Sequence, residues 1–347
     1  MSLYRVEVQG FIERCMMAVG TKPHHARSLA EVLVAADSRG HYSHGLNRMD
    51  MYVKDIKSGV CAVDGEPLAE KQSAATALVD GKNLLGPVVG NFCMNLAIRK
   101  AKEVGIGWVV AHGSNHFGIA GFYAMQALKD NMIGMSFTNT SPLVVPTRGK
   151  ERTLGTNPLS VAAPAKDGDS FVLDTATSAV ALGKVELSER HGDSIPDGWG
   201  CDPQGKITAD PKRVLTGGGL VPIGGSEATG QRVSLEHLVR WVSLGGALAR
   251  PWGHGEGMIR TPWVVVGCLS GAGGVLLGKC FSNVVVLPQA DPDAPVLTPG
   301  DPERASLKKC EEMGGILYHI NVVKYMNDYA KKIGVSELLP CDETVTT

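Results

Sequence analysis

The sequence has no excess of charge and no long hydrophobic run. Its 34 Lys and Arg residues nearly balance its 35 Asp and Glu residues, for a formal net charge of −1. It therefore lacks the basic surface that attracts nucleic acid or an anionic membrane, and we expect neither as a partner. No stretch of about 18 apolar residues occurs, and residues 1–7 contain no apolar core of signal-peptide length. These absences predict a cytoplasmic protein.

Two short motifs that often reveal function are also missing. The eight cysteines contain no Cys-x-x-Cys pair, which argues against a zinc knuckle or a disulfide framework and predicts reduced thiols. No predicted strand is followed by Gly-x-Gly-x-x-Gly with an acidic residue about twenty positions later, so the ordinary dinucleotide fingerprint is absent. A dinucleotide would need another cradle, for which the candidates are residues 174–177 and the glycine turn at 222–226.

The chain of 347 residues is long enough for two domains or one large α/β domain. Its hydrophobic periodicity predicts helices at residues 6–18, 26–36, 86–104 and 120–128, with Pro23 at a helix start. It predicts strands at residues 74–79, 107–111, 132–138 and 170–174. Three of these strands end in His, Asn, Ser or Thr. Because α/β enzymes place their chemistry at strand ends, we expect one polar rim that includes Asn115, His116, Asn139 and Asn157.

The apolar spacing of residues 46–56 predicts a further helix. On such a helix His44, Arg48 and Tyr52 would share one face at positions i, i+4 and i+8. Arg binds a carboxylate through two parallel hydrogen bonds, and a neutral His accepts a proton from a nearby hydroxyl. The row therefore predicts a binding site for a small carboxylic acid. The alternative is that these side chains lie on a solvated helix face.

The histidines at 41 and 44, and those at 112 and 116, form two pairs that resemble zinc ligands. Neither pair has a carboxylate or thiolate at matching spacing, so no metal is expected there, although a zinc hydrolase stays open as an alternative. The histidines that we expect on the surface are His24, His25, His191 and His237.

Five motifs together identify a family resemblance. They are Asp37-Ser38-Arg39-Gly40-His41-Tyr42-Ser43-His44-Gly45 with Arg48 following, Gly113-Ser114-Asn115-His116-Phe117-Gly118, Leu154-Gly155-Thr156-Asn157-Pro158, Asp174-Thr175-Ala176-Thr177-Ser178, and Pro299-Gly300-Asp301-Pro302-Glu303-Arg304. In this order they make the chain similar to the type-2 malate/L-lactate dehydrogenases, a family that also contains ureidoglycolate and sulfolactate dehydrogenases. The resemblance runs from the N-terminus to about Gly230 and resumes over residues 277–335.

The resemblance implies an NAD(P)-dependent oxidoreductase that works as a homodimer, with a sulfolactate dehydrogenase-like fold. That fold is α/β but not of the Rossmann type, and consists of a mixed sheet with flanking helices. We expect residues 1–70 and 300–340 to form a helical substrate and dimerisation domain, and residues 71–299 to form the NAD(P)-binding domain. The predicted reaction moves a hydride between the nicotinamide and C2 of a small 2-hydroxy or 2-oxo acid, malate- or lactate-like.

The same resemblance implies roles for individual residues. The acid/base is the residue matching His116, or else His44. The predicted substrate contacts are Ser43, Arg48 and Tyr52, to which we add Asn115, a candidate to orient the imidazole, and Thr140. The predicted cofactor contacts, to NAD or NADP, are Asp174, Thr175, Ala176, Gly224, Gly225, Gly300, Asp301 and Glu303.

The sequence departs from the family pattern after Gly230. Residues 231–275 become rich in Gly, Trp and Arg, and the family pattern then recovers. We hypothesise a reading-frame slip or a wrongly predicted exon, which resequencing the transcript tests. If the chain is as written, part of the cofactor wall and a core helix are affected, and a homologue without catalytic activity is the alternative.

Overall fold

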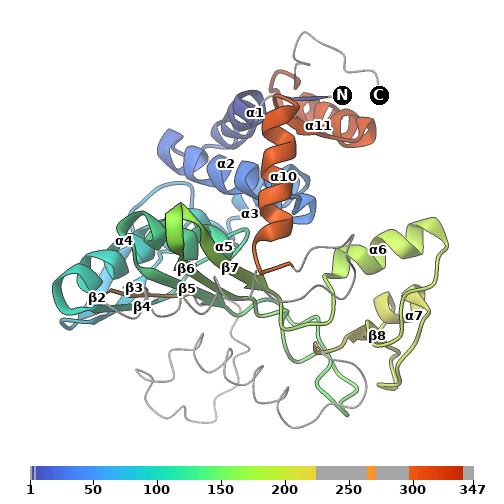
Figure 1. Ribbon diagram of the computed structural model, residues 1–347. Coiled ribbons are helices and arrows are strands. Elements are labelled where there is room, and N and C mark those ends of the chain that lie inside the picture. The colour runs from blue at the N-terminus through green and yellow to red at the C-terminus, as the bar shows by residue number, and fades with distance from the viewer. Residues whose placement is uncertain (1, 4, 224–263, 271–296, 339–347) are drawn as a thin grey trace.

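A mixed sheet of seven strands forms the centre of the protein (Figure 1). The computed structural model describes residues 2–3, 5–223, 264–270 and 297–338. The strands, in the order in which they lie across the sheet, are β2 (Leu68–Gln72), β3 (Thr76–Asp80), β4 (Ile106–His112), β10 (Val264–Leu269), β5 (Ile133–Thr138), β6 (Leu159–Pro164) and β7 (Ser170–Thr175). Strand β3 is parallel to β4, and every other neighbouring pair is antiparallel.

The two faces of the sheet are buried against different cores. Alternate residues of β10 show this division, because successive side chains of a strand point to opposite faces. Val264 and Val266 join the main core, and Val265 joins a second cluster with Val110 and Phe137. The main core continues from the sheet through helix α4 (Gly86–Val104) into the N-terminal helices. One continuous core therefore connects the sheet with the helices above it.

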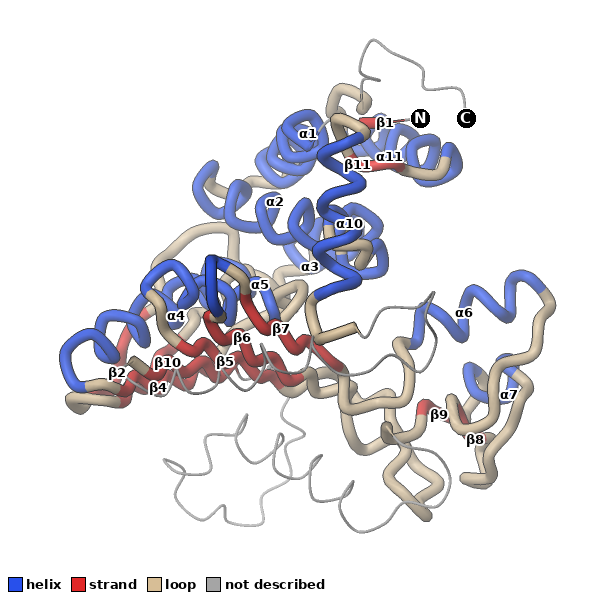
Figure 2. The backbone as a smooth tube through the Cα atoms, in the orientation of Figure 1, coloured by secondary structure: helices blue, strands red, loops and turns tan. Residues whose placement is uncertain are grey.

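Helices gather on one side of the sheet (Figure 1). Besides α4, they are α1 (Arg5–Ala18), α2 (Pro23–Ser38), α3 (Met49–Lys57), α5 (Gly121–Ala124), α10 (Asp301–Glu312) and α11 (Ile320–Ile333), with the 3-10 segments η1 (Tyr42–His44), η2 (Leu46–Arg48), η3 (Met125–Asp130) and η4 (Lys166–Gly168). Strand β1 (Ser2–Leu3) pairs with β11 (Ile316–Leu317), so the beginning of the chain lies beside its C-terminal part (Figure 2). In the described ranges no helix is both long and apolar enough to cross a membrane.

A smaller unit projects from the edge of the sheet beyond β7 (Figure 2). It contains α6 (Leu182–His191), α7 (Pro211–Leu215) and the antiparallel pair of β8 (Gly200–Cys201) and β9 (Gly219–Leu220). It has its own apolar cluster, in which Val185 and Val214 pack with Val144, Leu154 and Leu220. The sequence did not predict this separate cluster.

Most of the helices and strands that the hydrophobic periodicity predicts are confirmed. Helices α1, α2 and α4 and strands β3, β4, β5 and β7 lie where the sequence predicts them, and α2 begins at Pro23. The predicted helix over 120–128 is divided into α5 and η3. The mixed sheet with flanking helices confirms the predicted fold class.

The region expected to diverge from the family contains a central strand. Val264–Leu269 was assigned to the divergent segment 231–275, yet it forms β10 and pairs with β4 and β5 over its full length. The run Val264-Val265-Val266 is rich in β-branched residues, which favour strands, so the signal was present in the sequence. The segment expected to diverge in sequence therefore still supplies a strand to the middle of the sheet.

Candidate active site

The ends of β3, β4, β5 and β7 lie at one edge of the sheet. Because β10 is antiparallel to both β4 and β5, and β6 is antiparallel to both β5 and β7, these four strands run in the same direction. The segments that follow them, at residues 113–118, 139–140 and 176–178, therefore leave the sheet at the same edge. The predicted rim is confirmed.

The segment that carries His44 is not the predicted helix. Residues 42–44 and 46–48 form two short 3-10 turns, and α3 begins only at Met49. Gly45 separates the turns with φ −100° and ψ −139°. A Cβ atom at Gly45 would lie 1.8 Å from Oδ1 of Asp37, and Leu46 N donates to Oδ2 of the same carboxylate at 2.8 Å. The buried carboxylate thus occupies the space beside Gly45 and interrupts the helix. The prediction that His44, Arg48 and Tyr52 form a row on one helix face is therefore wrong.

Asp37 also connects this segment to the C-terminal part of the chain. Its side chain is fully buried, and the hydroxyl of Tyr318 donates to Oδ2 at 2.5 Å. Burial raises the pKa of Asp37 to about 7, although both donors oppose this shift. The sequence reasoning missed this pair, because the two residues are 281 positions apart and neither carries a local signal of its partner.

His116 and Tyr52 form the centre of the candidate site. The Tyr52 hydroxyl and Nδ1 of His116 are 2.6 Å apart, and Gly118 N donates to the same Nδ1 at 3.3 Å. The Tyr52 side chain is buried, whereas His116 keeps part of its surface exposed. Because Nδ1 is occupied by these contacts, Nε2 is the ring nitrogen that remains for a substrate.

The loop that carries His116 approaches the start of α4 closely. A Cβ atom at Gly86 would lie 2.3 Å from the carbonyl oxygens of both Asn115 and His116, so only glycine fits at this position. The Asn115 amide donates to the carbonyls of Asn83 and Leu84 at 2.9 and 3.2 Å. Asn115 therefore fastens the loop to the backbone of 83–84, and the hydrogen bond that orients the imidazole comes from Tyr52 instead.

His44 stacks against His116, and Arg48 lies close to both. The two rings are 5.9 Å apart between centroids, with 21° between their planes. Ser43 Oγ is 2.9 Å from Nδ1 of His44, and the Ser43 carbonyl accepts a hydrogen bond from Nε of Arg48 at 2.6 Å. Within the described part of the chain, the Ser43 carbonyl is the one hydrogen-bond acceptor of the Arg48 guanidinium. The two Nη groups of Arg48 therefore stay available to a ligand.

Both imidazoles are neutral at pH 7. Burial, together with the positive charge of Arg48 and the neighbouring imidazole, lowers the pKa of His116 to about 3. Burial, Arg48 and His41 lower the pKa of His44 to about 4. Burial raises the pKa of Tyr52 far above its ordinary value, so its phenol keeps its proton. The site thus holds one fixed positive charge beside two rings that can accept a proton.

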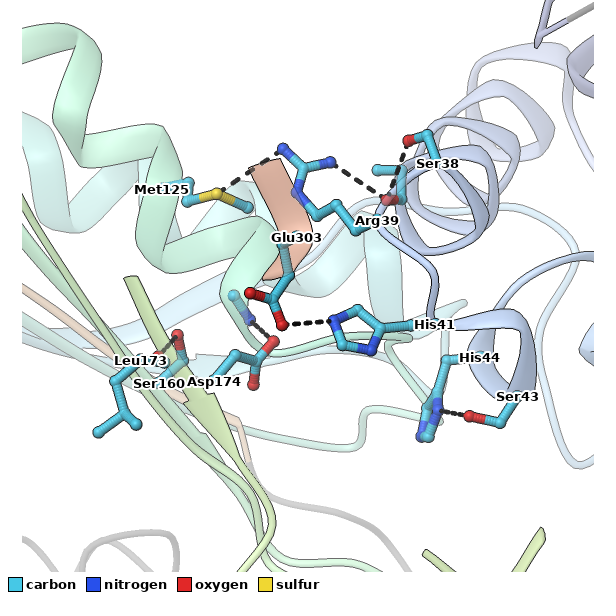
Figure 3. Close-up of polar contacts among 12 residues, drawn as sticks. Ser38, Arg39, His41, Ser43, His44, Met125, Ser160, Leu173, Asp174 and Glu303 are labelled. Atoms are coloured by element: carbon cyan, nitrogen blue, oxygen red, sulfur yellow. Dashed lines mark hydrogen bonds and ion pairs between the residues drawn. The ribbon is translucent and has the colours of Figure 1, made fainter. Parts of the chain in front are cut away.

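A second polar group lies where α10 meets β7 (Figure 3). Glu303 is located between His41 and Asp174, with its Oε1 3.5 Å from Nε2 of His41. Asp174 Oδ2 accepts a hydrogen bond from Gly121 N at 2.6 Å. Burial raises the pKa of Asp174 to about 6, and the charge of Glu303 adds to the rise. The structure therefore brings together two predicted cofactor contacts from distant parts of the sequence.

The loop before α10 is attached to β7. Val172 N donates to the Pro299 carbonyl at 3.1 Å, and Arg304 donates to the Ser170 carbonyl at 2.9 Å. Gly300 has φ +102°, which suits glycine, and Asp301 forms an ion pair with Arg304. Gly300, Asp301 and Glu303 thus lie beside the strand that carries Asp174.

The remaining predicted residues are placed as follows. Thr140 Oγ1 accepts a hydrogen bond from Thr156 N at 2.9 Å, and Thr140 N donates to the buried Asn157 at 3.0 Å. The Thr175 hydroxyl donates to the Ala176 carbonyl at 3.0 Å. Gly224 and Gly225 lie outside the described residues. These contacts of Thr140 are with the segment 156–157, and its contact with a substrate stays a prediction.

The two histidine pairs that resemble zinc ligands make other contacts in the structure. His112 Nε2 lies 3.0 Å from Glu70 of β2, and Nε2 of His41 lies 3.5 Å from Glu303. Among the described residues, a group of three possible metal ligands is found elsewhere, at His24, His25 and Glu66. The expectation that His25 lies on the surface is wrong, since its side chain is fully buried.

Comparison with known proteins shows which proteins this chain is similar to. The profile of the malate/L-lactate dehydrogenase family matches residues 4–271. The chain is 47% identical to a malate dehydrogenase of Pyrococcus horikoshii over 215 residues, 62% of this chain and 59% of that protein. The sequence match thus spans about three fifths of that curated relative.

Two solved structures extend the likeness over nearly the whole chain. The sulfolactate dehydrogenase from Methanocaldococcus jannaschii superimposes with a TM-score of 0.84 at 30% identity, and the match covers 97% of this chain and 98% of that one. The malate dehydrogenase from Entamoeba histolytica superimposes with a TM-score of 0.87 at 26% identity, covering 99% of each chain.

Proposed function

Because the chain belongs to the malate/L-lactate dehydrogenase family, we propose that it is an NAD(P)-dependent oxidoreductase. The proposed reaction transfers a hydride at C2 of a small 2-hydroxy or 2-oxo acid, malate- or lactate-like. One observation carries this proposal: a neutral His116 is held through Nδ1 by Tyr52 and lies beside His44 and Arg48. An acid/base next to a fixed cation matches a substrate with a hydroxyl beside a carboxylate.

In the oxidation direction Nε2 of His116 accepts the proton of the C2 hydroxyl. For Nε2 to do so, the hydrogen of the neutral ring must sit on Nδ1, where the Tyr52 oxygen accepts it and the longer contact from Gly118 N, at 3.3 Å, is given up. In the reduction direction the same Nε2 returns the proton to the oxygen of a 2-oxo acid. We assign Tyr52 as the positioning residue that fixes the ring and its tautomer.

Arg48 binds the substrate carboxylate in this scheme. Its Nε donates to the Ser43 carbonyl, which fixes the plane of the guanidinium, and both Nη groups remain for a bidentate contact. Holding the carboxylate also fixes C2 of the substrate, which lowers the entropic cost of the reaction. We expect His44, whose ring is oriented by the Ser43 hydroxyl, to contact the substrate oxygen.

The residues near β7 fit a dinucleotide in their chemistry. Asp174 and Glu303 offer carboxylate acceptors, which suit the hydroxyl groups of a ribose. Gly300 and Asp301 lie on the adjoining loop. The chemistry that NAD or NADP supplies when bound is the acceptance or donation of a hydride.

A titration of the purified full chain tests the proposal. NADH and NADPH fluorescence measures cofactor binding, and a panel of 2-oxo acids then reports oxidation of the reduced nicotinamide by absorbance. We expect saturable cofactor binding and turnover with at least one acid. Dimerisation without cofactor binding would instead support a non-catalytic homologue. Stoichiometric zinc that persists after His24→Gln, with no nicotinamide oxidation, would support a hydrolase.

We also propose a homodimer that works in the cytoplasm. The residues assigned to the helical substrate and dimerisation domain, 1–70 and 300–340, contain α1, α2, α3, α10 and α11, which gather on one side of the sheet (Figure 1). The six cysteines in the described ranges are free thiols, which suits a reducing compartment. Sedimentation of the purified chain measures the oligomeric state.

A further inference from the structure

His25 is a buried histidine without hydrogen bonds. It lies in the first turn of α2, its side chain is fully buried, and neither ring nitrogen has a hydrogen-bond partner. The Val63 carbonyl lies near the ring, but the contact does not have hydrogen-bond geometry. A buried polar group without a hydrogen-bond partner is unfavourable, so its presence here needs a reason.

Two further metal-binding groups face this ring. The ligand atoms of His24, His25 and Glu66 all lie within 4.8 Å of one another. Nε2 of His24 is 3.6 Å from Oε1 of Glu66, and the centroids of the two imidazoles are 4.2 Å apart. Ligands around a tetrahedral zinc ion at about 2.1 Å lie roughly 3.4 Å from each other. The His24–Glu66 pair, at 3.6 Å, is already close to that spacing, and the ligand atom of His25 lies within 4.8 Å of both partners.

The backbone holds the two parts of this group together. Lys22 N donates to the Val63 carbonyl at 3.2 Å, and the Lys22 ammonium lies 3.4 Å from Asp64. Asp64 in turn accepts a hydrogen bond from Gly65 N at 2.8 Å. These contacts attach the segment 63–66, which leads to the sheet, to the start of α2. The arrangement of the histidines and Glu66 thus depends on the fold and not on chain proximity alone.

The charges around His25 favour a cation. Burial and His24 lower the pKa of His25, which keeps its ring neutral and able to bind a metal. Glu66 supplies negative charge on the exposed side, and Asp64 adds a smaller part because it is paired with Lys22. This acidic side opposes the positive potential at the start of α2, which would otherwise disfavour a cation.

We propose that His24, His25 and Glu66 bind one divalent transition-metal ion, with zinc as the expected ion. Two imidazole nitrogens and one carboxylate oxygen are a ligand set that zinc accepts, and water completes the coordination. The ion would join α2 to the segment 63–66. The site lies at the opposite end of α2 from His41, roughly 20 Å along the helix axis, so its role is structural and separate from the proposed oxidoreductase site.

Metal titration of the full chain, stripped with chelator and dialysed, tests the proposal. Calorimetry with zinc and the visible absorbance of cobalt should both report one ion per chain. The exposed ligands allow substitutions with little risk to folding, and we expect His24→Gln and Glu66→Gln each to weaken zinc binding at least tenfold. Zinc should raise the melting temperature of the parent chain but not that of Glu66→Gln.

His112→Gln is the matched control, because His112 also pairs with a glutamate, Glu70 at 3.0 Å, in another part of the fold. It should keep the parent affinity. Failure of the parent chain to bind one zinc ion would overturn the proposal. So would parent-like binding by His24→Gln and Glu66→Gln, or an equal loss in the control.

Discussion

Replacing Tyr52 with Phe removes a single hydroxyl and tests how His116 is held. The Tyr52 hydroxyl lies 2.6 Å from Nδ1 of His116. In the variant, among the described residues, the remaining hydrogen-bond partner of Nδ1 is Gly118 N, at 3.3 Å. Because a backbone N–H can only donate, it favours the ring form with hydrogen on Nε2, and that form cannot accept a proton from a substrate.

The expected loss follows from the strength of this contact. During oxidation the ring becomes positively charged, and a hydrogen bond to a charged group contributes about 1.5–3 kcal/mol. Since about 1.4 kcal/mol is a factor of ten in rate, kcat should fall roughly ten- to hundredfold. Cofactor affinity should not change, because Tyr52 is buried and directed at the imidazole.

Steady-state kinetics, cofactor titration and ¹⁵N NMR of the histidine rings measure these effects. Tyr123→Phe is the matched control, since Tyr123 is equally buried and donates to the Phe117 carbonyl at 2.5 Å without touching the His116 ring nitrogens. We expect the control to lose stability but to keep the His116 nitrogen shifts. A Tyr52→Phe variant with parent kcat and parent shifts would refute the reasoning.

Three further substitutions test the site and its support. His116→Ala should lower kcat about 10²- to 10⁴-fold in the turnover assay with cofactor affinity retained, and near-normal turnover would transfer the acid/base role to His44. Arg48→Lys should raise KM at least about tenfold with a smaller effect on kcat, because an ammonium cannot make the bidentate contact; an unchanged KM would contradict the assigned grip. Asp37 has a folded-state pKa of about 7, above its ordinary 3.8. Its contribution to the free energy of unfolding is therefore complete below pH 4 and is lost as the pH rises to about 7, by on the order of 4 kcal/mol. Asp37→Asn keeps an acceptor for Leu46 N and should flatten this dependence in urea unfolding measured from pH 4 to 7; a slope equal to that of the parent would exclude Asp37 as its source.

The sequence predicted the elements whose signals are local. Pro23 marks the start of α2, and apolar runs mark β4, β5 and β7. The rim of polar residues was predicted from the polar side chains at which those apolar runs end. His44, Arg48 and Tyr52 were predicted to act together, although as one face of a single helix, and His116 meets them from the loop after β4.

Long-range contacts account for what the sequence could not show. The predicted row of His44, Arg48 and Tyr52 on one helix face was wrong because Asp37 occupies the space beside Gly45. Hydrophobic periodicity does not encode this contact. Tyr52 reaches His116 across 64 positions, and Tyr318 reaches Asp37 across 281. The polar type of His25 suggested a surface position, whereas the docking of segment 63–66 buries it.

The position of β10 affects how the protein can fold during synthesis. Strands β4 and β5 both pair with β10 and lie on either side of it, so the sheet stays in two halves until Leu269 has left the ribosome. Until then each half exposes an unpaired strand edge, which is the kind of surface that associates with other chains. A chain that ended before Val264, or whose codons there were read out of frame, would never close this gap and would depend on chaperones to stay in solution.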